Sequence, residues 1–352
     1  MISDLRPRKL SRPTMKEINS SPTPSLKKGK MLKVGITLGD PAGIGPEVAL
    51  KAVKHLEKGT IAPVLIGRAR VLFDLYPSLA AGLPVVEDPG AVADHSPCIF
   101  DVPFDAPVPV PGIGSILTGA ESKKYIDTAI DLWRGNIIDA IVTGPVHKGF
   151  IEKSGTPFTG HTEYMAGAIH EEKPYMMMYS RDYRVLLATT HIPLREVYRH
   201  VDVKRLVEVI TIGYESIRSI DGGDVVLAVT GFDPHCGDDG AIGDFDGKIT
   251  AEAVRECRSR GIPVEGPFSA DTLFIPENWK KYNLVIVHYH DQGLIPFKLL
   301  AFDSGVNVTL GLSLVRTSVD HGTAFDIAGK DKAQFSSMIE AIKIAEMLVL
   351  RR

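Results

Sequence analysis

Cysteine is scarce in this chain of 352 residues, and its pattern excludes a disulfide-stapled secreted domain. Cys98, Cys236 and Cys257 are an odd number without the regular spacing of a disulfide framework, which favours a reducing compartment and predicts a cytoplasmic protein. Long apolar runs are also absent, because none approaches the roughly 18 residues that span a bilayer. Residues 1–30 have no hydrophobic segment typical of a secretory signal, so we expect no membrane association.

An excess of positive charge is lacking as well. The chain has 40 Lys and Arg against 43 Asp and Glu, a formal charge of -3, which gives no general attraction to nucleic acid. Any anionic ligand must therefore be bound by local groups. A hydrophobic content of 44% and a charged content of 24% are typical of a globular protein.

The first thirty residues differ from the rest of the chain. They contain four prolines, five serines and eight Lys or Arg, with no apolar periodicity. We expect a disordered basic tail, a solvated leader before an effective start of the fold at Met31, with a basic contact arm as the alternative.

From Leu32 onward, short apolar runs alternate with helical stripes, which predicts an α/β fold with a largely parallel sheet covered on both faces. The expected strands are residues 32–38, 62–66, 137–142, 185–189, 225–229, 284–287 and 307–310. The expected helices include 47–56, a stripe that follows Asp202 as N-cap, and a stripe over 335–345. The proline-rich segment 101–113 should cross the surface.

Glycines between the first strand and the first helix form the first candidate site. In Gly39–Glu47 they permit a tight turn, and Pro46 suits the first turn of a helix. The spacing does not match the dinucleotide fingerprint GxGxxG. A nucleotide site and a structural turn both remain open.

Histidines follow several predicted strands or lie in loops rich in glycine and proline. They are His161, His191, His235 and His290. Because ligands bind outside the carboxyl ends of strands, such residues can converge on one cleft, and three imidazoles can hold a divalent ion. No pair shows a specific metal-binding spacing, so structural roles remain the alternative.

Lys298, Asn307 and Arg316 are polar residues in apolar, glycine-rich surroundings. A lysine and an arginine in this context suit a phosphate or a carboxylate. Ordinary ion pairing with Asp303 or Asp320 is the alternative.

Eight strings in this order resemble the motif series of the 4-hydroxythreonine-4-phosphate dehydrogenase family, from Leu32 to the C-terminus. They are ITLGDPAGIGPE, VTGPVHKG, FTGHTE, ATTHIPLR, ADTLF, YHDQGLIPFK, GVNVTLGL and RTSVDHGTAFDIAGK. The resemblance implies NAD-dependent oxidation of 4-phosphooxy-L-threonine at its C3 hydroxyl, then decarboxylation toward 3-amino-2-oxopropyl phosphate in pyridoxine biosynthesis. It also implies a homodimer whose active site is shared between the subunits.

Several residue roles follow from this resemblance. It implies a divalent metal, zinc, cobalt or magnesium, bound by His191, His235 and His290. The implied substrate contacts are His161, Thr162, Lys298, Asn307 and Arg316. Asp271 or Asp291 would take up the proton or orient a ligand imidazole. In GFDPHCG, the segment around His235, Asp233 precedes the proline where relatives commonly have asparagine, and Cys236 follows the histidine where they commonly have a small residue. We interpret Cys236 as a bystander rather than a fourth metal ligand.

A more distant resemblance to isocitrate and isopropylmalate dehydrogenases implies a two-lobed, three-layer α/β/α fold with a cleft between the lobes. Residues 31–150 plus 291–352 would form the dinucleotide-binding lobe, and 151–290 the metal and dimerisation lobe. By the same resemblance His321, Gly322, Thr323 and Asp326 would bind the dinucleotide. An aspartate there accepts bonds from ribose hydroxyls and repels a 2'-phosphate, which favours NAD over NADP.

Two alternatives to this function differ in class. The first is a dehydrogenase of 4-phospho-D-threonate or 4-phospho-D-erythronate, since the C2 substituent is the discriminating group and no residue is assigned to it. The second is a phosphate acyltransferase or a non-catalytic module that binds phosphorylated ligands. The presence of the metal histidines and of the HGTAFDIAGK loop favours the dehydrogenase.

Overall fold

A computed structural model describes residues 31–57, 59, 61–92, 95–171 and 173–351. The predicted tail, residues 1–30, lies outside the described residues. In the part of the chain that is described, no helix combines the length and the apolar character that crossing a bilayer requires.

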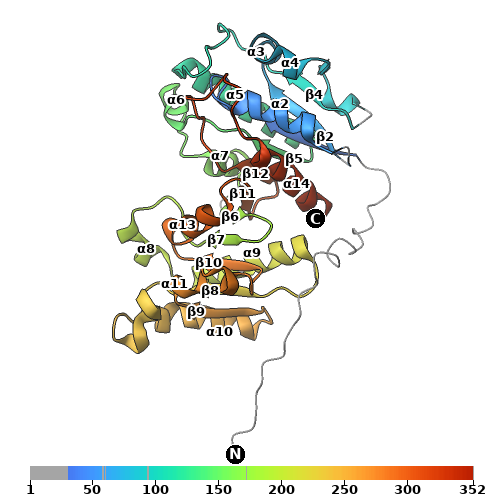
Figure 1. The fold of residues 1–352 in the computed structure, drawn as a ribbon. Helices are drawn as coiled ribbons and strands as arrows, with labels where there is room; N and C mark the ends of the chain where they lie inside the picture. Colours follow the sequence, from blue (N-terminus) through green and yellow to red (C-terminus); the bar gives the residue numbers. More distant parts are fainter. Residues whose placement is uncertain (1–30, 58, 60, 93–94, 172, 352) are drawn as a thin grey trace, which may run out of the picture. The chain divides into compact units, whose positions relative to one another are not determined.

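A 12-stranded sheet in the order β3-β4-β2-β1-β5-β12-β11-β6-β7-β10-β8-β9 forms the centre of the described part (Figure 1). The strands are β1 (Leu32–Thr37), β2 (Ile61–Gly67), β3 (Val85–Val86), β4 (Cys98–Asp101), β5 (Ala140–Thr143), β6 (Tyr175–Tyr179), β7 (Arg184–Leu187), β8 (Leu227–Thr230), β9 (Val264–Phe268), β10 (Leu284–Val287), β11 (Val306–Leu310) and β12 (Val315–Val319). Most neighbouring strands are parallel, as predicted. The middle of the sheet is not parallel, because β12–β11, β11–β6 and β6–β7 are antiparallel pairs.

Helices fill the connections between the strands. They are α2 (Gly45–His55), α3 (Ala69–Leu75), α4 (Pro77–Ala80), α5 (Ile116–Arg134), α6 (Lys148–Lys153), α7 (His161–Ala168), α8 (Leu194–His200), α9 (Val203–Asp221), α10 (Ala251–Ser259), α11 (Ala270–Leu273), α12 (Pro276–Trp279), α13 (His290–Ala301) and α14 (Ser336–Leu350). Short helices of other types are η1 (Pro89–Ala91), η2 (Pro234–Gly240) and η3 (Asp246–Thr250).

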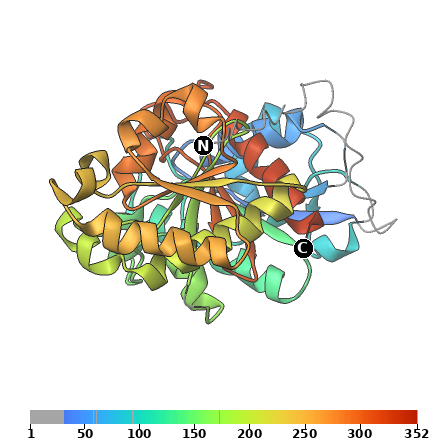
Figure 2. The ribbon, with the colours of Figure 1, turned by 90° about the horizontal axis from the view of Figure 1, so that it is seen from below.

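Both faces of the sheet are covered, as alternate residues of β7 show. Leu186 belongs to the large hydrophobic core, and its Cδ2 approaches Gly213 of α9 so closely that a Cβ there would lie 2.8 Å away. Its neighbour Val185 packs on the opposite face in a second core with Leu294 and Phe297 of α13. Helix α10 packs on α9 and β9 (Figure 2). The predicted α/β class and the helices on both faces are confirmed.

Local signals in the sequence account for the ends of several helices. Pro46 lies in the first turn of α2, and Asp202 caps α9 by accepting a 2.7 Å hydrogen bond from the Arg205 amide, both as predicted. The proline-rich segment 101–113 contains no helix, and it is held by Arg68, which donates to the carbonyls of Phe104 (3.2 Å) and Ala106 (2.5 Å).

Candidate active site

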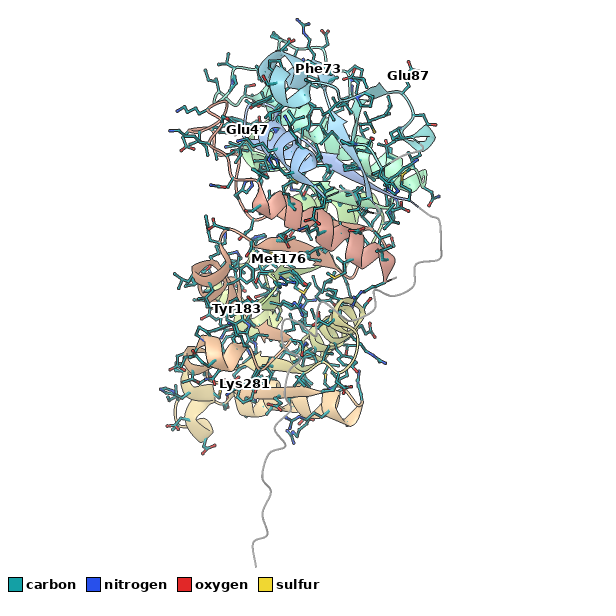
Figure 3. All side chains as sticks on the ribbon, turned by 45° about the vertical axis from the view of Figure 1, so that its right-hand side comes forward. Glu47, Phe73, Glu87, Met176, Tyr183 and Lys281 are labelled. Atoms are coloured by element: carbon teal, nitrogen blue, oxygen red, sulfur yellow. The ribbon has the colours of Figure 1, made fainter. Side chains whose placement is uncertain are left out.

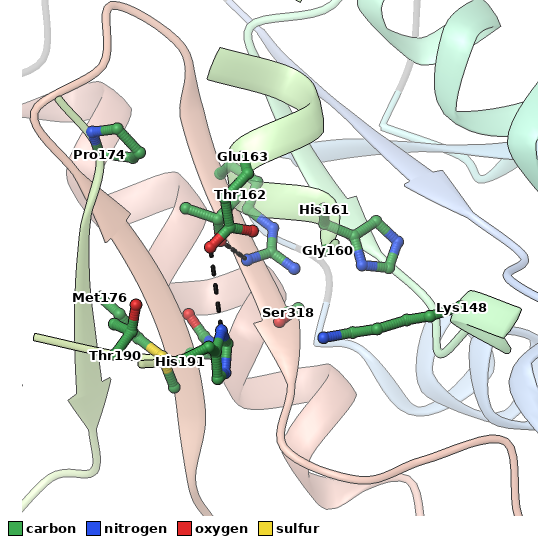
Figure 4. A pocket seen from close by; sticks show the side chains of 12 residues that line it. Lys148, Gly160, His161, Thr162, Glu163, Pro174, Met176, Thr190, His191 and Ser318 are labelled. Carbon is green, nitrogen blue, oxygen red and sulfur yellow. Dashed lines mark hydrogen bonds and ion pairs between the residues drawn. The ribbon is translucent and has the colours of Figure 1, made fainter. Parts of the chain in front are cut away.

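A cavity of about 200 Å³ opens on the sheet where β12, β11 and β6 lie side by side. Thr317 of β12 donates a 2.8 Å hydrogen bond to Ala341 of α14, so the alternate residues Arg316 and Ser318 point to the other face, into the cavity. Met176 of β6, which is labelled in Figure 3, also lines the cavity. The lining residues are Lys148, Gly160, His161, Thr162, Glu163, Pro174, Met176, Thr190, His191, Asn307, Arg316 and Ser318 (Figure 4).

Strand register brings the floor residues together. Arg316 of β12 is paired with Thr309 of β11, which is paired in turn with Met176 of β6. Asn307 of β11 is paired with Ser318. The polar floor is thus a row of cross-strand neighbours, fixed by backbone hydrogen bonds rather than by loops.

Arg316 is a buried cation, with 3% of its surface exposed. Its guanidinium donates to the hydroxyls of Thr143 (2.7 Å), Thr162 (3.3 Å) and Thr309 (3.3 Å). It forms no ion pair with a carboxylate among the described residues, and its Nε has no partner there. Burial lowers the pKa of Arg316 to about 10, which still leaves it charged at neutral pH.

His161 begins α7 beside this cation. Burial, together with the positive charges of Arg316 and Lys148, lowers the pKa of His161 well below its usual value, so its imidazole is neutral. Its Nε2 and the Oδ1 of Asn307 are both buried without a hydrogen-bond partner in the described chain. Buried polar atoms without partners are uncommon, and these two identify a place for a polar ligand.

His191 and His290 meet at the edge of the cavity. They follow the carboxyl ends of β7 and β10, which are parallel neighbours, and their ring centroids are 5.7 Å apart. The Nδ1 of His290 lies 2.7 Å from Asp291, and that of His191 lies 3.9 Å from Glu163. Of the two predicted carboxylates, Asp291 therefore contacts a predicted metal ligand.

His235 follows β8, the next strand beyond β10, but does not complete a cluster. No group of three or more histidine, cysteine or acidic side chains able to hold a metal occurs within the described residues. His235 lies in η2, where residues 235–239 all have positive φ. Asp246 is fully buried and holds the preceding segment by accepting from the amides of Phe232 (2.8 Å) and Asp233 (2.9 Å).

Two residues with sequence-based expectations, Asp271 and Cys236, lie in or near this turn. Asp271 accepts a 2.7 Å hydrogen bond from Ser269, which is the main reason its pKa is lowered, and the charge of His235 acts in the same direction. Cys236 packs on Gly231, with its Sγ 2.7 Å from where a Cβ would stand, and burial raises the pKa of its thiol.

Lys298 is not among the described residues that line the cavity. Its Nζ lies 3.2 Å from Asp320, which is the ion pair that residue types alone left open as the alternative. The second oxygen of Asp320 is buried without a partner in the described part, and burial raises the pKa of this carboxyl.

The glycine motif and the late HGTAFDIAGK loop lie against each other. The amide of Ile44 donates a 2.9 Å hydrogen bond to the carbonyl of Thr323, and a Cβ on Gly43 would stand only 2.8 Å from that oxygen. His321 places its Nδ1 3.1 Å from the Gly322 carbonyl, while its Nε2 is buried and has no partner in the described chain. The two motifs thus form one backbone-lined surface.

Sequence reasoning assigned no role to Lys148, Glu163, Thr190 or Ser318, which also line the cavity. Lys148 and Glu163 stand inside the motifs VTGPVHKG and FTGHTE, next to residues that were assigned. Their place next to assigned residues is the sequence feature that could have identified them as lining residues. Thr190 directly precedes His191 in the same way.

Comparison with known proteins gives a consistent result. The family model described as "Pyridoxal phosphate biosynthetic protein PdxA" matches residues 60–345. A 4-hydroxythreonine-4-phosphate dehydrogenase of Desulforapulum autotrophicum is 39% identical over 321 residues, covering 89% of this chain and 94% of the relative. The crystal structure of the Klebsiella pneumoniae 4-hydroxythreonine-4-phosphate dehydrogenase superposes with a TM-score of 0.78 at 33% identity, covering 92% of this chain and 100% of that one.

A solved relative of another name is also similar. The terephthalate 1,2-cis-dihydrodiol dehydrogenase of Burkholderia xenovorans has a TM-score of 0.64 and 27% identity, and the match covers 90% of this chain and 98% of that one. These full-length relatives are dehydrogenases by name, which agrees with the dehydrogenase expected from the motifs rather than with an acyltransferase or a binding module. The chain belongs to the PdxA family of pyridoxal phosphate biosynthetic proteins and is an oxidoreductase of the 4-hydroxythreonine-4-phosphate dehydrogenase type.

Proposed function

We propose that this protein oxidises the C3 hydroxyl of 4-phosphooxy-L-threonine with NAD and decarboxylates the product toward 3-amino-2-oxopropyl phosphate. The observation that carries the proposal is Arg316, a buried cation without a described carboxylate partner. Leaving a charge unpaired in the interior is unfavourable, so the site favours an anion that completes it. The hydroxyls of Thr162 and Thr309 accept from the guanidinium and lie 3.4 Å from each other, so one donates to the other and the remaining hydroxyl proton is left for a phosphate oxygen.

The remaining substrate contacts follow from the same row of residues. His161 and Asn307 each present a buried polar atom without a described partner, suited to the phosphate or the C3 hydroxyl. Lys298 would join the substrate by leaving its ion pair with Asp320. We retain all five of these residues as substrate ligands, with Arg316 as the principal one.

His191 and His290 fit a divalent metal ion. Their rings are close, and the contact between His290 Nδ1 and Asp291 leaves Nε2 for coordination, the arrangement in which a carboxylate orients a ligand histidine. A bound metal lowers the pKa of a coordinated hydroxyl and stabilises negative charge on its oxygen. Nitrogen donors suit zinc, with cobalt or magnesium as alternatives.

We assign the third position to His235 and infer that a homodimer completes the site. Ile295 (59% exposed) and Leu299 (79%) of helix α13 and Phe302 (63%), which directly follows the helix, are spaced by four and three residues. Leu194 and Tyr198 of α8 add further exposed apolar surface close to His191. Such an apolar area beside a ligand set that is incomplete in the described chain favours a second copy that contributes residues to it.

Proton transfer is assigned to the two carboxylates. Asp291 positions His290, as the 2.7 Å contact indicates. Asp271 is ionised at neutral pH and interacts with His235, so we assign proton uptake to it. Each subunit would contribute Asp271 and Asp291 to the site along with its metal-binding histidines.

The dinucleotide is proposed to bind where Gly43 lies under the loop of His321, Gly322 and Thr323. The unpaired, buried Nε2 of His321 fits a ligand atom there. The exposed carboxylate of Asp326 favours the ribose hydroxyls of NAD over a 2'-phosphate. We expect a higher kcat/KM with NAD than with NADP in steady-state kinetics, and a higher value with NADP would contradict the role of Asp326.

The location that fits best is the cytoplasm. Cys236 and Cys257 are thiols rather than disulfide sulfurs in the described chain. Burial raises the pKa of Cys257 to about 11, which keeps this thiol protonated and unreactive. A phosphorylated metabolite and NAD are also intracellular molecules.

The test is NADH formation with 4-phosphooxy-L-threonine, 4-phospho-D-threonate and 4-phospho-D-erythronate, each with and without a chelator. We expect turnover to be fastest with 4-phosphooxy-L-threonine and to stop when the metal is removed. Faster turnover of either sugar acid would transfer the function to that substrate. No turnover of any of them by metal-replete enzyme would overturn the proposal.

A further inference from the structure

Gln292 is a buried side chain of α13 for which the proposed function has no use. Its Oε1 accepts a 2.8 Å hydrogen bond from the backbone N–H of His288, and its Nε2 donates a 2.8 Å hydrogen bond to the carbonyl of Gly231. A backbone N–H only donates and a carbonyl only accepts, so these two partners require a side chain with an acceptor and a donor at one end. The amide therefore links the end of β10 to the end of β8.

The hydrogen bonds of Gln292 belong to a buried polar network between these two strands. The hydroxyl of Thr230, the last residue of β8, lies 3.0 Å from Gln292 Oε1. The fully buried His288 donates a 2.9 Å hydrogen bond from its Nε2 to the Thr230 carbonyl. A buried polar group that loses its partner bears the full desolvation penalty, so the network favours one relative position of the two strand ends.

Gly231 connects this network to the turn that carries His235. A Cβ on Gly231 would lie 2.7 Å from the Sγ and 3.2 Å from the Cα of Cys236, the residue after His235. The Gly231 amide also donates a 2.7 Å hydrogen bond to the carbonyl of Phe268 in β9. Since the turn packs directly on this glycine, the position of the Gly231 peptide determines where His235 stands.

The strand that leads to His191 is attached to the same end of β10. Thr189, which lies beyond the end of β7, donates a 2.7 Å hydrogen bond from its hydroxyl to the carbonyl of His288. His288 is thus bonded through its carbonyl to Thr189 and through its N–H to Gln292. His191 follows Thr189 by two residues. One series of hydrogen bonds therefore joins the three strand ends that precede the proposed metal ligands.

We infer that Gln292 is a positioning residue for the metal site, and that its amide holds the segment leading to His235 against the strand end that carries His290. The inference rests on the proposed function, which assigns both histidines to the metal. The two hydrogen bonds of the amide lie within one chain, so they position both segments in each copy, whichever copy's metal His235 binds. Groups that orient metal ligands from outside the coordination sphere contribute about 10- to 100-fold to metal affinity.

The test measures cobalt(II) binding to the full chain by competition with a chelator, together with the visible absorption spectrum of the cobalt-loaded protein. Gln292→Met keeps the length of the side chain and removes both hydrogen bonds. Cobalt affinity should fall by about 10- to 100-fold, and the absorption bands should shift or change intensity because the arrangement of nitrogen donors changes. Gln292→Asn should act in the same direction, because its amide is one methylene too short to reach both backbone groups.

Asn283→Leu is the matched control, because Asn283 joins the same two strands at their other ends. Its side-chain oxygen accepts a 3.0 Å hydrogen bond from the backbone N–H of Val226, the residue before β8, and Asn283 itself directly precedes β10. The substitution removes this hydrogen bond at the ends of the strands opposite to the histidines. It should lower the melting temperature and leave the cobalt affinity and the cobalt spectrum unchanged.

An unchanged cobalt affinity and spectrum in the Gln292 variants would overturn the inference. An equal loss of affinity in Asn283→Leu would overturn it as well, because the effect would then follow general stability. If neither Gln292 variant folds, the residue is structural and the inference also fails. If the unmodified protein binds no cobalt, the proposed metal site itself fails, so the two failures are distinguishable.

Discussion

The two ends of the candidate site are built in different ways. Around Arg316, side chains from β5, β11, β12 and α7 converge in the interior of one chain, and the register of neighbouring strands sets their positions. Around His191 and His290 the side chains are half-buried or exposed, they follow strand ends, and exposed apolar residues of α13 and α8 lie beside them.

For the dimer proposed above, this difference separates the part of the site that one chain forms from the part that we assign to two. The end around Arg316 is formed by the fold of a single chain, and the Arg316 Nε has no partner among the described residues. The end around the histidines has two close imidazoles, while His235 lies in a separate left-handed turn. Binding of phosphate should therefore survive changes that abolish metal binding, and four experiments test that separation.

The largest effect is expected from Arg316→Met. Loss of a charge-assisted contact of two hydrogen bonds should lower kcat/KM by about 10²- to 10⁴-fold and weaken phosphorylated ligands similarly in calorimetry. Because the cation has no described carboxylate partner, removing it should leave the melting temperature unchanged or raise it.

Arg184→Met is the matched control, since Arg184 forms an ion pair with Asp221 at 2.5 Å. It should lower the melting temperature and leave kcat/KM unchanged. A strong loss of stability in the Arg316 variant would show that this residue is structural.

Leu299→Asp should act on the other end of the site. A carboxylate in the exposed apolar surface of α13 should weaken subunit association by about 30-fold or more, with loss of bound zinc and of turnover. Sedimentation velocity and zinc analysis measure both effects, and phosphate-ligand binding should persist. Val85→Asp, at an exposed apolar residue of β3, should leave association intact. An unchanged dimer in the Leu299 variant would exclude this surface as the interface.

Asp246→Asn should have a smaller effect on the same end. The Asp246 carboxylate accepts hydrogen bonds from two backbone N–H groups that precede His235 and a 2.7 Å hydrogen bond from the Thr250 hydroxyl. An asparagine side chain has one acceptor oxygen in place of two, so it would lose some of these hydrogen bonds. We expect zinc affinity to fall by about 10- to 100-fold in a chelator competition, with unchanged binding of phosphorylated ligands. If the affinity for zinc stays the same, His235 is not a ligand that this segment positions.

The smallest effect concerns pH and the end around Arg316. The pKa of His161 is lowered in the folded protein, so between that value and about 6.5 the unfolded chain binds more protons. The free energy of unfolding should therefore fall as the pH drops below about 6.5, by at most about 1.4 kcal/mol per pH unit for this group.

Urea unfolding of the protein and of His161→Gln from pH 7.5 to pH 5 isolates this contribution. The difference in unfolding free energy between the two should shrink as the pH falls, because the variant lacks the titrating group. A difference that stays constant with pH would mean that His161 is as readily protonated in the folded state as in the unfolded state.

Apolar runs were sufficient to predict most buried strands. β1, β2 and β10 match the expected ranges to within one residue, because both faces of these strands are buried and apolar. β12 was not predicted. Its sequence, Val-Arg-Thr-Ser-Val, has three polar residues in a row, two of which, Arg316 and Ser318, line the cavity. The strand therefore lacks the apolar run by which the other buried strands were predicted.

The candidate site was predictable where strand ends are neighbours. His191 and His290 converge because β7 and β10 pair in parallel, as the reasoning from strand ends anticipated. The turn that carries His235 was not predictable, because four residues other than glycine adopt positive φ within 235–239, against their intrinsic preference. The pairing of Lys298 with Asp320 depends on tertiary contacts and could only be left as an alternative.

The place of β11 and β12 in the sheet has a consequence for synthesis of the protein. These strands stand between β5 and β6 although more than a hundred residues of the chain intervene before they are made. A nascent chain that ends before Val306 has β5 and β6 as separate open edges, and Arg316 has not yet been translated. The segment that joins the two parts of the sheet also carries Arg316, so a polypeptide that has the arginine to which we assign the phosphate already has the strands that close its sheet.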